Sequence, residues 1–459
     1  MTPLWTAEEL QEATGGTVDT PFVASGLSID TRTLVRGDLF IALQGDDRDG
    51  HAFVSDAIAK GAAGAMVHRP MPGAFPLVHV DDTFGALARL GAFARARFEG
   101  QVIGVTGSVG KTTTKEMLRT VLSALGPTHA AVASYNNQWG LPLTLARTPR
   151  NAMFCVAEIG MNHAGEIAPL ARLARPHAAI ITAVEKAHIG YLGSIEAIAD
   201  EKASIMQGLE PGGVAVLPAD SPLLPRLRAA AGRIRVITFG ASAAAEIRLV
   251  TYEPDANGSA ILVDVAGRDV RLRLKAPGQH MAMNALSALG GVMALGLDAT
   301  VAAGALEAFR PMAGRGARRQ IRLPGGTALL LDESYNGNGA SMRAALDVLR
   351  LQPANRRIAV LGDMLELGDL GPAEHAALAR DVARSANKLF ACGPLMRHLF
   401  DAVPPALRGA HVHDAAALAP LVAKAVAPGD AILVKGSLGS RMKQVVDVLD
   451  GLAPSAGAA

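Results

Sequence analysis

Residues 101–117, QVIGVTGSVGKTTTKEM, decide how the surrounding chain folds. The apolar run predicts a buried strand, the glycines predict a sharp turn, and the threonines open a predicted helix. This order directs backbone N–H groups and a helix N-terminus toward one point, which suits a polyphosphate. We expect Lys111 to reach the β- and γ-phosphates and the Thr112 hydroxyl to ligate Mg²⁺.

The glycine spacing departs from the common phosphate-loop pattern G-x-x-x-x-G-K-[ST]. Val105 occupies the first glycine position, and Gly104 lies one residue too early. The alternative is an ordinary strand–turn–helix crossover with a chance GKT, but all parts of the loop occur in the required order. The remaining pattern, T-G-x-x-G-K-T, gives the expected ATP contacts Thr106, Gly107, Ser108, Val109, Gly110, Lys111, Thr112 and Thr113.

On both sides of this loop, apolar runs alternate with amphipathic helical patterns. From 99 to 312 this alternation predicts a central domain with a parallel sheet covered by helices, and this domain carries the phosphate loop. Residues 246–278 within it predict short antiparallel strands in a small side sheet. Residues 1–98 predict a small α/β domain that ends in a helix over 82–98, and residues 313–459 predict a Rossmann-like α/β domain. The expected fold class is therefore α/β, in three domains.

Composition excludes several classes of protein. Among 459 residues there are 44 Lys and Arg and 42 Asp and Glu, a net charge of +2 that argues against a nucleic-acid coat or a basic membrane tether. Two cysteines cannot form a disulfide framework. The N-terminus has no signal-peptide pattern, and the apolar stretch 281–297 is too short to span a bilayer. We expect a cytoplasmic monomer with no nucleic acid and no membrane as partner.

Three downstream residues are candidates for a metal site. Glu158 ends an apolar strand, where a buried carboxylate requires a cation, although a structural salt bridge or helix cap is the alternative. His188 follows another apolar strand, where a lone histidine is commonly structural. Lys202 lies in the apolar stripe of a predicted helix, where desolvation would lower the pKa of its ammonium. The alternative there is a lysine whose head reaches water.

The shortened loop TGSVGKTTTKEM resembles the ATP loop of the Mur ligase family, which forms amide bonds with ATP in peptidoglycan precursor synthesis. EIGMNHAGEI, which begins at Glu158, resembles the family segment whose glutamate binds Mg²⁺. His188 matches the position that contacts a second Mg²⁺. The lysine similar to Lys202 is carbamylated by CO₂ in the family, which turns a cation into a carboxylate that orients Mg²⁺. The resemblance thus implies Lys111, Lys202 and His188 as catalytic, and Thr112, Glu158, His188 and carbamylated Lys202 as metal-side residues.

Two further segments resemble the family's nucleotide contacts. KAPGQHMAMNALSALG (275–290) resembles the adenine-side motif, with Met281 where asparagine is usual, so the contact falls to Asn284. The alternative is an amphipathic helix with a polar start. PMAGRGARRQ (311–320) resembles the inter-domain segment whose arginine, here Arg315, reaches the nucleotide.

Two segments of the third domain resemble motifs for closure and for the acceptor. DESYNGNGASM (332–342) implies that Asp332, Tyr335 and Asn336 act on the nucleotide side or in closure. VKGSLGSRM implies that Lys435 and Ser437 lie near the acceptor or a phosphate. In that string, Leu438 replaces the usual arginine.

The first domain resembles the UDP-binding domain of the two later ligases of the pathway. The string SIDTR implies that Ser28, Asp30, Thr31 and Arg32 contact the uridine and diphosphate. ASYNNQWGLPLTL (133–145) resembles a family segment in which Asn136 and Asn137 contact the UDP-sugar. An asparagine-rich turn before a helix is the alternative.

Within the family, GDMLELGD (362–369) and DESYNGNGASM resemble the last cytoplasmic ligase. The resemblance implies ATP, Mg²⁺ and the joining of D-alanyl-D-alanine to UDP-N-acetylmuramoyl-tripeptide through an acyl phosphate. The alternatives are the preceding ligase, which adds a diamino acid, folylpolyglutamate synthetase, and a nucleotide-dependent switch without ligation. The third residue of the tripeptide, meso-diaminopimelate or lysine, stays open.

Overall fold

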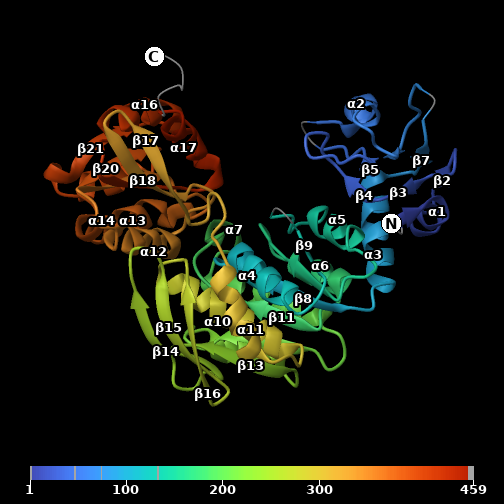
Figure 1. The fold of residues 1–459 in the computed structure, drawn as a ribbon, viewed down its shortest axis with the longest axis horizontal. Helices are drawn as coiled ribbons and strands as arrows, with labels where there is room; N and C mark the ends of the chain where they lie inside the picture. Colours follow the sequence, from blue (N-terminus) through green and yellow to red (C-terminus); the bar gives the residue numbers. More distant parts are fainter. Residues whose placement is uncertain (1–2, 46–47, 74, 132–133, 453–459) are drawn as a thin grey trace.

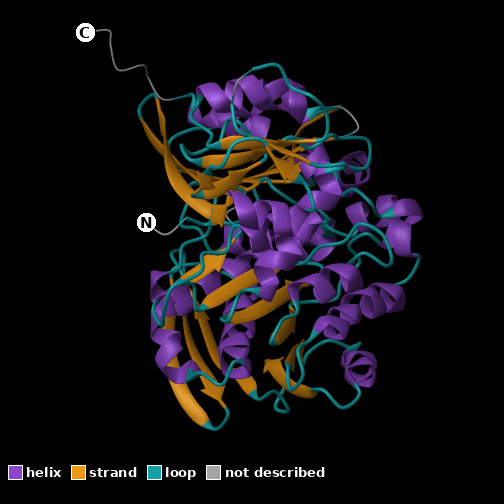
Figure 2. Ribbon diagram, turned by 90° about the vertical axis from the view of Figure 1, so that its right-hand side faces the viewer, coloured by secondary structure: helices purple, strands orange, loops and turns teal. Residues whose placement is uncertain are grey.

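The computed structural model describes residues 3–45, 48–73, 75–131 and 134–452. Three α/β units follow one another along the chain, and Figure 1 shows the first and third on opposite sides of the view, above the second. We call them the N-terminal unit (5–96), the central unit (101–308) and the C-terminal unit (317–450). Each unit has its own sheet, and Figure 2 shows the strands lying between layers of helices.

The N-terminal unit has a five-stranded sheet in the order β2-β7-β6-β5-β4, parallel except at the edge strand β2. The helix expected over 82–98 is α3, and it begins where the Asp82 side chain accepts hydrogen bonds from the N–H groups of Phe84 and Gly85. The elements are β1 (Trp5–Thr6), α1 (Ala7–Thr14), β2 (Thr17–Val18), β3 (Val23–Ala24), β4 (Gly26–Ser28), β5 (Asp38–Ile41), α2 (Val54–Ala59), β6 (Gly64–Val67), β7 (Leu77–His79) and α3 (Thr83–Ala96).

Helix α3 joins the N-terminal unit to the central unit and packs on α5 (Gly140–Ala146) of the central unit. The two helices approach closely at Gly91, where an added Cβ would lie 2.8 Å from the backbone of Pro142. Leu143 and Ala146 of α5 belong to the N-terminal core, whereas Leu141 and Leu145 belong to the central core. Helix α5 is therefore shared by two cores.

The central unit has nine strands in the order β16-β15-β14-β13-β12-β11-β8-β10-β9. From β9 to β14 the pairing is parallel, and helices cover both faces of the inner strands, so β8, β10, β11 and β12 are mostly apolar and buried. The elements are β8 (Gln101–Thr106), α4 (Lys111–Ser123), β9 (Thr128–Ala130), β10 (Phe154–Glu158), α6 (Ile167–Ala174), β11 (Ala178–Ile181), α7 (Ile189–Leu192), α8 (Ile195–Ala203), β12 (Val214–Pro218), α9 (Leu224–Ala231), β13 (Arg235–Gly240), β14 (Ile247–Pro254), β15 (Ser259–Val265), β16 (Arg268–Leu274), α10 (Gln279–Ala294) and α11 (Ala299–Ala303).

The expected antiparallel side strands are β14, β15 and β16. They join the parallel strands only where Phe239 and Gly240 of β13 pair with Ile247 and Arg248 of β14. The alternation of buried and partly buried residues along β15 indicates one face on the core and one toward water. The side sheet is thus an extension of the main sheet at one edge.

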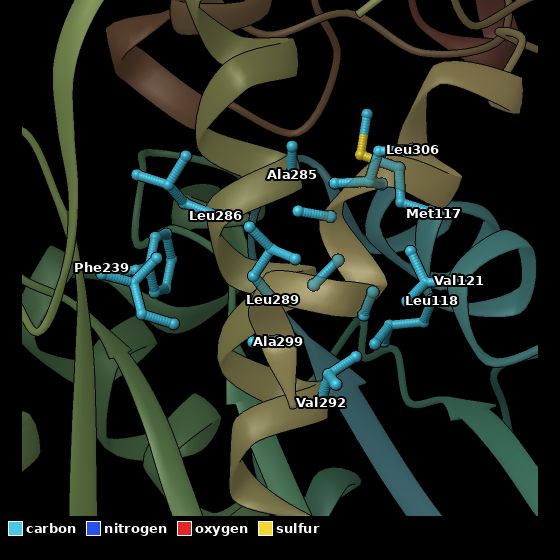
Figure 3. Close-up of a cluster of buried hydrophobic side chains, with 14 of the residues drawn as sticks. Met117, Leu118, Val121, Phe239, Ala285, Leu286, Leu289, Val292, Ala299 and Leu306 are labelled. Atoms are coloured by element: carbon cyan, nitrogen blue, oxygen red, sulfur yellow. The ribbon is translucent and has the colours of Figure 1, made fainter. Parts of the chain in front are cut away.

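Helix α10 packs between α4 and the strands of the central unit (Figure 3). Leu289 of α10 and Leu118 of α4 lie in the same buried cluster, together with Phe239 of β13. At Gly291 an added Cβ would lie 2.8 Å from the side chain of Ile180, so this glycine permits the close approach of helix and sheet. Among the described helices, none combines the length and apolar character that crossing a membrane requires.

The C-terminal unit has a six-stranded sheet in the order β17-β18-β22-β19-β20-β21. The sequence predicts four of these strands and misses the edge strands β17 and β21. β17 was missed because its residues are mostly polar and only Ile321 and Leu323 are buried. The elements are β17 (Ala317–Leu323), β18 (Gly326–Glu333), α12 (Gly339–Arg350), β19 (Arg356–Gly362), α13 (Gly371–Ala376), α14 (Ala379–Ser385), β20 (Lys388–Cys392), α15 (Met396–Ala402), β21 (Arg408–Val412), α16 (Ala415–Ala425), β22 (Asp430–Lys435) and α17 (Lys443–Asp450).

Candidate active site

The loop between β8 and α4 forms the floor of the site at the carboxyl edge of the parallel strands. Gly107 and Gly110 have φ values of 151° and 86°, which disfavour any side chain. An added Cβ would lie 1.9 Å from Thr182 Oγ1 at Gly107 and 2.3 Å from Asn284 Oδ1 at Gly110. The loop therefore depends on both glycines, and α4 begins directly after Gly110.

A cavity of about 640 Å³ opens above this loop, between the central and C-terminal units. Its walls come from the ends of several strands of the central unit and from the start of α12 in the C-terminal unit. Most residues predicted from the sequence for contacts with the nucleotide, the metal, the UDP-sugar or the acceptor line this cavity. They are Ser108, Val109, Gly110, Lys111, Thr112, Thr113, Asn136, Asn137, Glu158, His188, Asn284, Arg315, Tyr335, Asn336 and Lys435.

The carboxylate of Glu158 is the acidic centre of the site. It is buried at the end of β10 and accepts hydrogen bonds from the Thr112 hydroxyl at 2.9 and 3.1 Å and from the Asn136 amide at 2.8 Å. A hydroxyl and a carboxylate are hard oxygen donors, and Mg²⁺ is commonly held by one or two carboxylates with phosphate and water oxygens. Thr112 and Glu158 thus fit a magnesium ion bound together with a triphosphate.

Two lysines belong to this part of the site: Lys111, which faces Glu158, and Lys202, which lies beside Lys111. The Lys111 ammonium donates to the carbonyl oxygen of Gly107 at 2.7 Å, and burial lowers its pKa although the charge of Glu158 opposes this. Lys202 is buried on α8, and burial together with the charge of Lys111 holds its pKa well below the ordinary value. The predicted desolvation of Lys202 is therefore confirmed, although its side chain does not line the cavity.

Arg315 connects the two units across the cavity. Its guanidinium stacks over the Tyr335 ring, 4.1 Å from the ring centre, and donates to the Ser134 hydroxyl at 3.0 Å. Ser134 also lies 3.3 Å from the Thr112 hydroxyl. Arg315 thus reaches the phosphate loop through one intervening side chain.

His280 and Asn284 bring the start of α10 to the cavity, and Met281 lines it as well. The Nδ1 atom of His280 is buried and has no hydrogen-bond partner among the described residues. Burial also lowers the pKa of this imidazole. A neutral histidine with an unpaired ring nitrogen can hydrogen-bond a ligand in the cavity.

The structure does not bring Asp332 to the cavity. Its carboxylate is buried and accepts hydrogen bonds from the Ser334 hydroxyl at 2.6 Å and the Ser334 N–H at 3.2 Å. The neighbouring Glu333 lines the cavity instead and lies 3.3 Å from the Lys435 ammonium. Successive side chains of a strand point to opposite faces, which separates the two acids.

Thr106, Gly107 and Ser437 lie beside the cavity without lining it. The Thr106 hydroxyl is buried at the end of β8 and has no partner among the described residues. The Ser437 hydroxyl donates to the carbonyl of Gly337 at 3.0 Å and accepts from the N–H of Leu365 at 2.9 Å. Ser437 therefore connects loops of the C-terminal unit that border the cavity.

The residues predicted for UDP lie on the loop after β4, in the N-terminal unit. The Ser28 hydroxyl donates to the backbone oxygen of Asp30, and the Asp30 carboxylate pairs with the exposed Arg32 guanidinium. The carbonyl of Thr31 accepts from Lys60 at 3.2 Å. None of these four predicted residues lines the large cavity.

Asn136 and Asn137, which were predicted to contact a UDP-sugar, form hydrogen bonds within the central unit. Asn136 contacts Glu158, as described above, and the Asn137 side chain accepts from the N–H of Gly140 at 3.0 Å. The second contact fixes the turn before α5. A contact of either residue with a UDP-sugar stays a prediction.

Sequence reasoning missed several residues of the site, among them Lys115, Ser134, Glu185 and Glu333. Lys115 is fully buried; its ammonium lies 2.6 Å from the carbonyl oxygen of Ala131 and 4.0 Å from Glu158 Oε2. It follows Thr112 by three residues on α4, so helical spacing predicts that both face the same side. Glu185 is placed by its backbone hydrogen bonds to Ser108, and Glu333 lies at the end of β18 in the C-terminal unit; the sequence near either residue carries no signal for its position at the cavity.

A phosphate loop at the carboxyl edge of a parallel sheet, with a buried acid on its threonine, defines a P-loop nucleotide-binding protein. Three family models match the chain: the Mur ligase family catalytic domain over residues 23–80, the Mur ligase middle domain over 105–292, and the Mur ligase glutamate ligase domain over 318–438. This chain belongs to the Mur ligase family.

Individual relatives are similar over almost the full length. The UDP-N-acetylmuramoyl-tripeptide–D-alanyl-D-alanine ligase of Synechocystis is 37% identical, covering 93% of this chain and 92% of the relative. A crystal structure of MurF from Acinetobacter baumannii is 31% identical with a TM-score of 0.83, covering 97% of this chain and 99% of that chain. The MurF ligase of Thermotoga maritima, solved with ADP, is 23% identical with a TM-score of 0.76, covering 93% and 97%, and shows the same fold.

Proposed function

We propose that this protein joins D-alanyl-D-alanine to UDP-N-acetylmuramoyl-tripeptide, with ATP converted to ADP and phosphate. One observation carries the proposal: Lys111, Thr112 and Glu158 meet in a cavity that is closed on its other side by the C-terminal unit. Support comes also from the names of the curated relatives, each of which is a ligase of this kind.

In the proposed reaction, the tripeptide carboxylate attacks the γ-phosphorus of ATP and forms an acyl phosphate. For this attack the carboxylate and the triphosphate, both anions, must approach to bonding distance, which costs electrostatic free energy in a site with little water. Lys111 and Arg315 offset this repulsion from two sides of the cavity. Mg²⁺ held by Thr112 and Glu158 would supply further positive charge.

The second step joins the acceptor. The amine of D-alanyl-D-alanine attacks the acyl carbon, and phosphate leaves after a tetrahedral intermediate. Residues of the C-terminal unit close one side of the cavity and exclude water, which protects the acyl phosphate from hydrolysis. Tyr335, Asn336 and Lys435 line this side and are the proposed contacts for the acceptor or the departing phosphate.

The N-terminal unit is the proposed site of the UDP end of the substrate. Ser28, Asp30, Thr31 and Arg32 follow one another at the end of β4, and the exposed guanidinium of Arg32, which is paired with Asp30 in this structure, is the proposed contact for the diphosphate. We propose domain boundaries near residues 98 and 312. We also propose that the enzyme is a monomer, and that it works in the cytoplasm, where ATP is supplied.

Carbamylation of Lys202 is part of the proposal. CO₂ reacts only with a neutral amine, and burial beside Lys111 favours the neutral form of Lys202. The product is a carboxylate, which would remove the repulsion between two adjacent cations. The modified side chain could then act with Glu158 and His188 toward Mg²⁺.

Phosphate release by the purified protein tests the proposed function. We expect D-alanyl-D-alanine to stimulate release only when UDP-N-acetylmuramoyl-tripeptide is also present. Phosphate release that requires a diamino acid together with a UDP-linked dipeptide precursor would indicate the preceding ligase. Release that requires glutamate together with a folate would indicate folylpolyglutamate synthetase. ATP hydrolysis without any product would indicate a nucleotide switch. A panel of UDP-tripeptides identifies the third residue.

A further inference from the structure

The cavity contains one carboxylate whose partner is missing. Five acidic side chains line it: Glu158, Glu166, Glu185, Asp220 and Glu333. Four of them have hydrogen bonds or ion pairs, namely Glu158 with Thr112, Glu166 with the N–H of Asn162, Asp220 with the N–H groups of Ala241 and Ser242, and Glu333 with Lys435. Among the described residues, the Glu185 carboxylate has neither.

Glu185 is nevertheless held in a fixed position. Its backbone N–H donates to the Ser108 hydroxyl at 2.9 Å, and that hydroxyl donates to the carbonyl of Glu185 at 3.0 Å. Ser108 belongs to the phosphate loop. The backbone of Glu185 is therefore fixed relative to the phosphate loop, and its side chain starts from that fixed point at the cavity wall.

Two cationic side chains, Lys186 and Arg343, lie near Glu185, but neither forms an ion pair with its carboxylate. Lys186 lies 2.7 Å from Glu374, and Arg343 of α12 lies 3.6 Å from Asp381, so each cation already has its own carboxylate. Burial raises the pKa of Glu185 even though Arg343 and Lys186 oppose this. A half-buried carboxylate in this state gains stability from a cationic ligand.

The chemistry of the surroundings favours an ammonium over a metal ion. Across the described residues, no group of three His, Cys, Asp or Glu side chains is placed to hold a metal. A single carboxylate flanked by Lys186 and Arg343 is a poor site for a divalent cation, which needs several oxygen donors. An ammonium, by contrast, needs one carboxylate for its strongest hydrogen bond.

We propose that Glu185 binds the ammonium group of the incoming acceptor. The inference rests on the proposed function, because D-alanyl-D-alanine is the substrate that carries such a group. Glu185 lies between the phosphate loop and the start of α12, where the amine must be close to the acyl phosphate. The residue thereby selects an acceptor that arrives as an ammonium and holds it beside the reacting carbon; the nitrogen attacks after one proton has passed from the ammonium to the Glu185 carboxylate and on to water.

The substitution Glu185→Gln tests this assignment in the full-length protein. We expect the KM for D-alanyl-D-alanine to rise about 10- to 100-fold, the loss typical of one hydrogen bond to a charged group. The KM for ATP should not change. Glu185→Asp should restore part of the affinity, and Glu196→Gln on the exposed side of α8 is the matched control.

An acceptor analogue separates binding from a structural effect. D-Lactoyl-D-alanine has a hydroxyl in place of the ammonium. As a competitive inhibitor of the wild type, it should therefore bind more weakly than D-alanyl-D-alanine does. In Glu185→Gln the two compounds should bind with similar affinity. A preference equal to that of the wild type would overturn the inference. If the wild type does not use D-alanyl-D-alanine at all, the proposed function fails instead.

Discussion

The imidazole of His188 and the carboxylate of Glu366 lie 2.5 Å apart across the boundary between the central and C-terminal units. Oε2 of Glu366 faces Nδ1 of His188, and the two side chains form an ion pair when the imidazole is protonated. Both residues have positive φ values, 61° and 66°, which are rare for side chains of this kind. The N–H of Gly190 also donates to the carbonyl of Glu366 at 3.0 Å. A candidate metal-side residue is thus held by a different unit.

Removal of this inter-unit pair should have a small effect. Glu366 is partly exposed, and exposed ion pairs contribute little, so we expect Glu366→Gln to lower kcat/KM by about 1.5- to 5-fold. Glu374→Gln removes an ion pair with Lys186, which also joins the central and C-terminal units, and should have a similar effect. The two losses should multiply in the double variant. A loss above about 100-fold in Glu366→Gln alone would show that this carboxylate contacts the reacting groups.

Lys111→Ala should abolish most of the activity. The ammonium lies at the phosphate loop, and in the proposed reaction it offsets the repulsion between the carboxylate and the triphosphate, so we expect a loss of roughly 10²–10⁴-fold in kcat. Phosphate release at saturating ATP measures this. Lys275→Ala removes an exposed lysine of the same unit and is the control. Activity near that of the wild type would show that the triphosphate binds elsewhere.

Lys202→Ala should be inactive and should regain part of its activity with formate or acetate. These small carboxylates can occupy the space of the missing side chain and supply the negative charge that carbamylation would provide. The measurement is phosphate release with and without the added carboxylate, and Lys275→Ala should not respond. Full activity of Lys202→Ala without any addition is the result that would contradict the assignment.

His129 should make the folded state sensitive to acid. Its Nε2 lies 3.0 Å from the carbonyl oxygen of Thr144, and burial lowers the pKa of the imidazole to about 4, from 6.5. Between these values the unfolded chain binds a proton that the folded chain does not, so the free energy of unfolding falls as the pH falls. At about pH 4 the loss should reach at most about 3 kcal/mol.

The variant His129→Gln can keep the donor and cannot titrate. Its denaturant midpoint should therefore decline less than that of the wild type as the pH is lowered from 7 toward 4. His413→Gln, at an exposed position, should follow the wild type. If the denaturant midpoints of the wild type and of His129→Gln fall equally with pH, His129 is not the cause of the acid sensitivity.

The sequence predicts the phosphate loop and its surroundings because the signal is local. A strand, two glycines, a lysine and a threonine within a short segment leave few alternative arrangements, and Gly107 and Gly110 form the expected turn, with positive φ values. The burial of Glu158 and Lys202 follows from apolar neighbours at strand or helix spacing. Each of these expectations depends only on residues close by in the chain.

Other features depend on contacts between distant segments. The motif around Asp332 matches the family, but the alternation of β18 directs Glu333 rather than Asp332 into the cavity. Nothing near Asn136 in the sequence indicates its hydrogen bond to Glu158. Glu185 becomes unusual only when every neighbouring acid is known to have a partner. Tertiary placement, not residue type, decides these cases.

Helix α5 has a mechanical consequence because it contributes to two cores. Its two faces are held by different units, and its first turn is fixed by Asn137, the neighbour of the asparagine that contacts Glu158. A rotation of the N-terminal unit must either carry this helix with it or open one of the two packed faces. Movement at the far end of the molecule can therefore displace the acidic centre without any flexible linker between them.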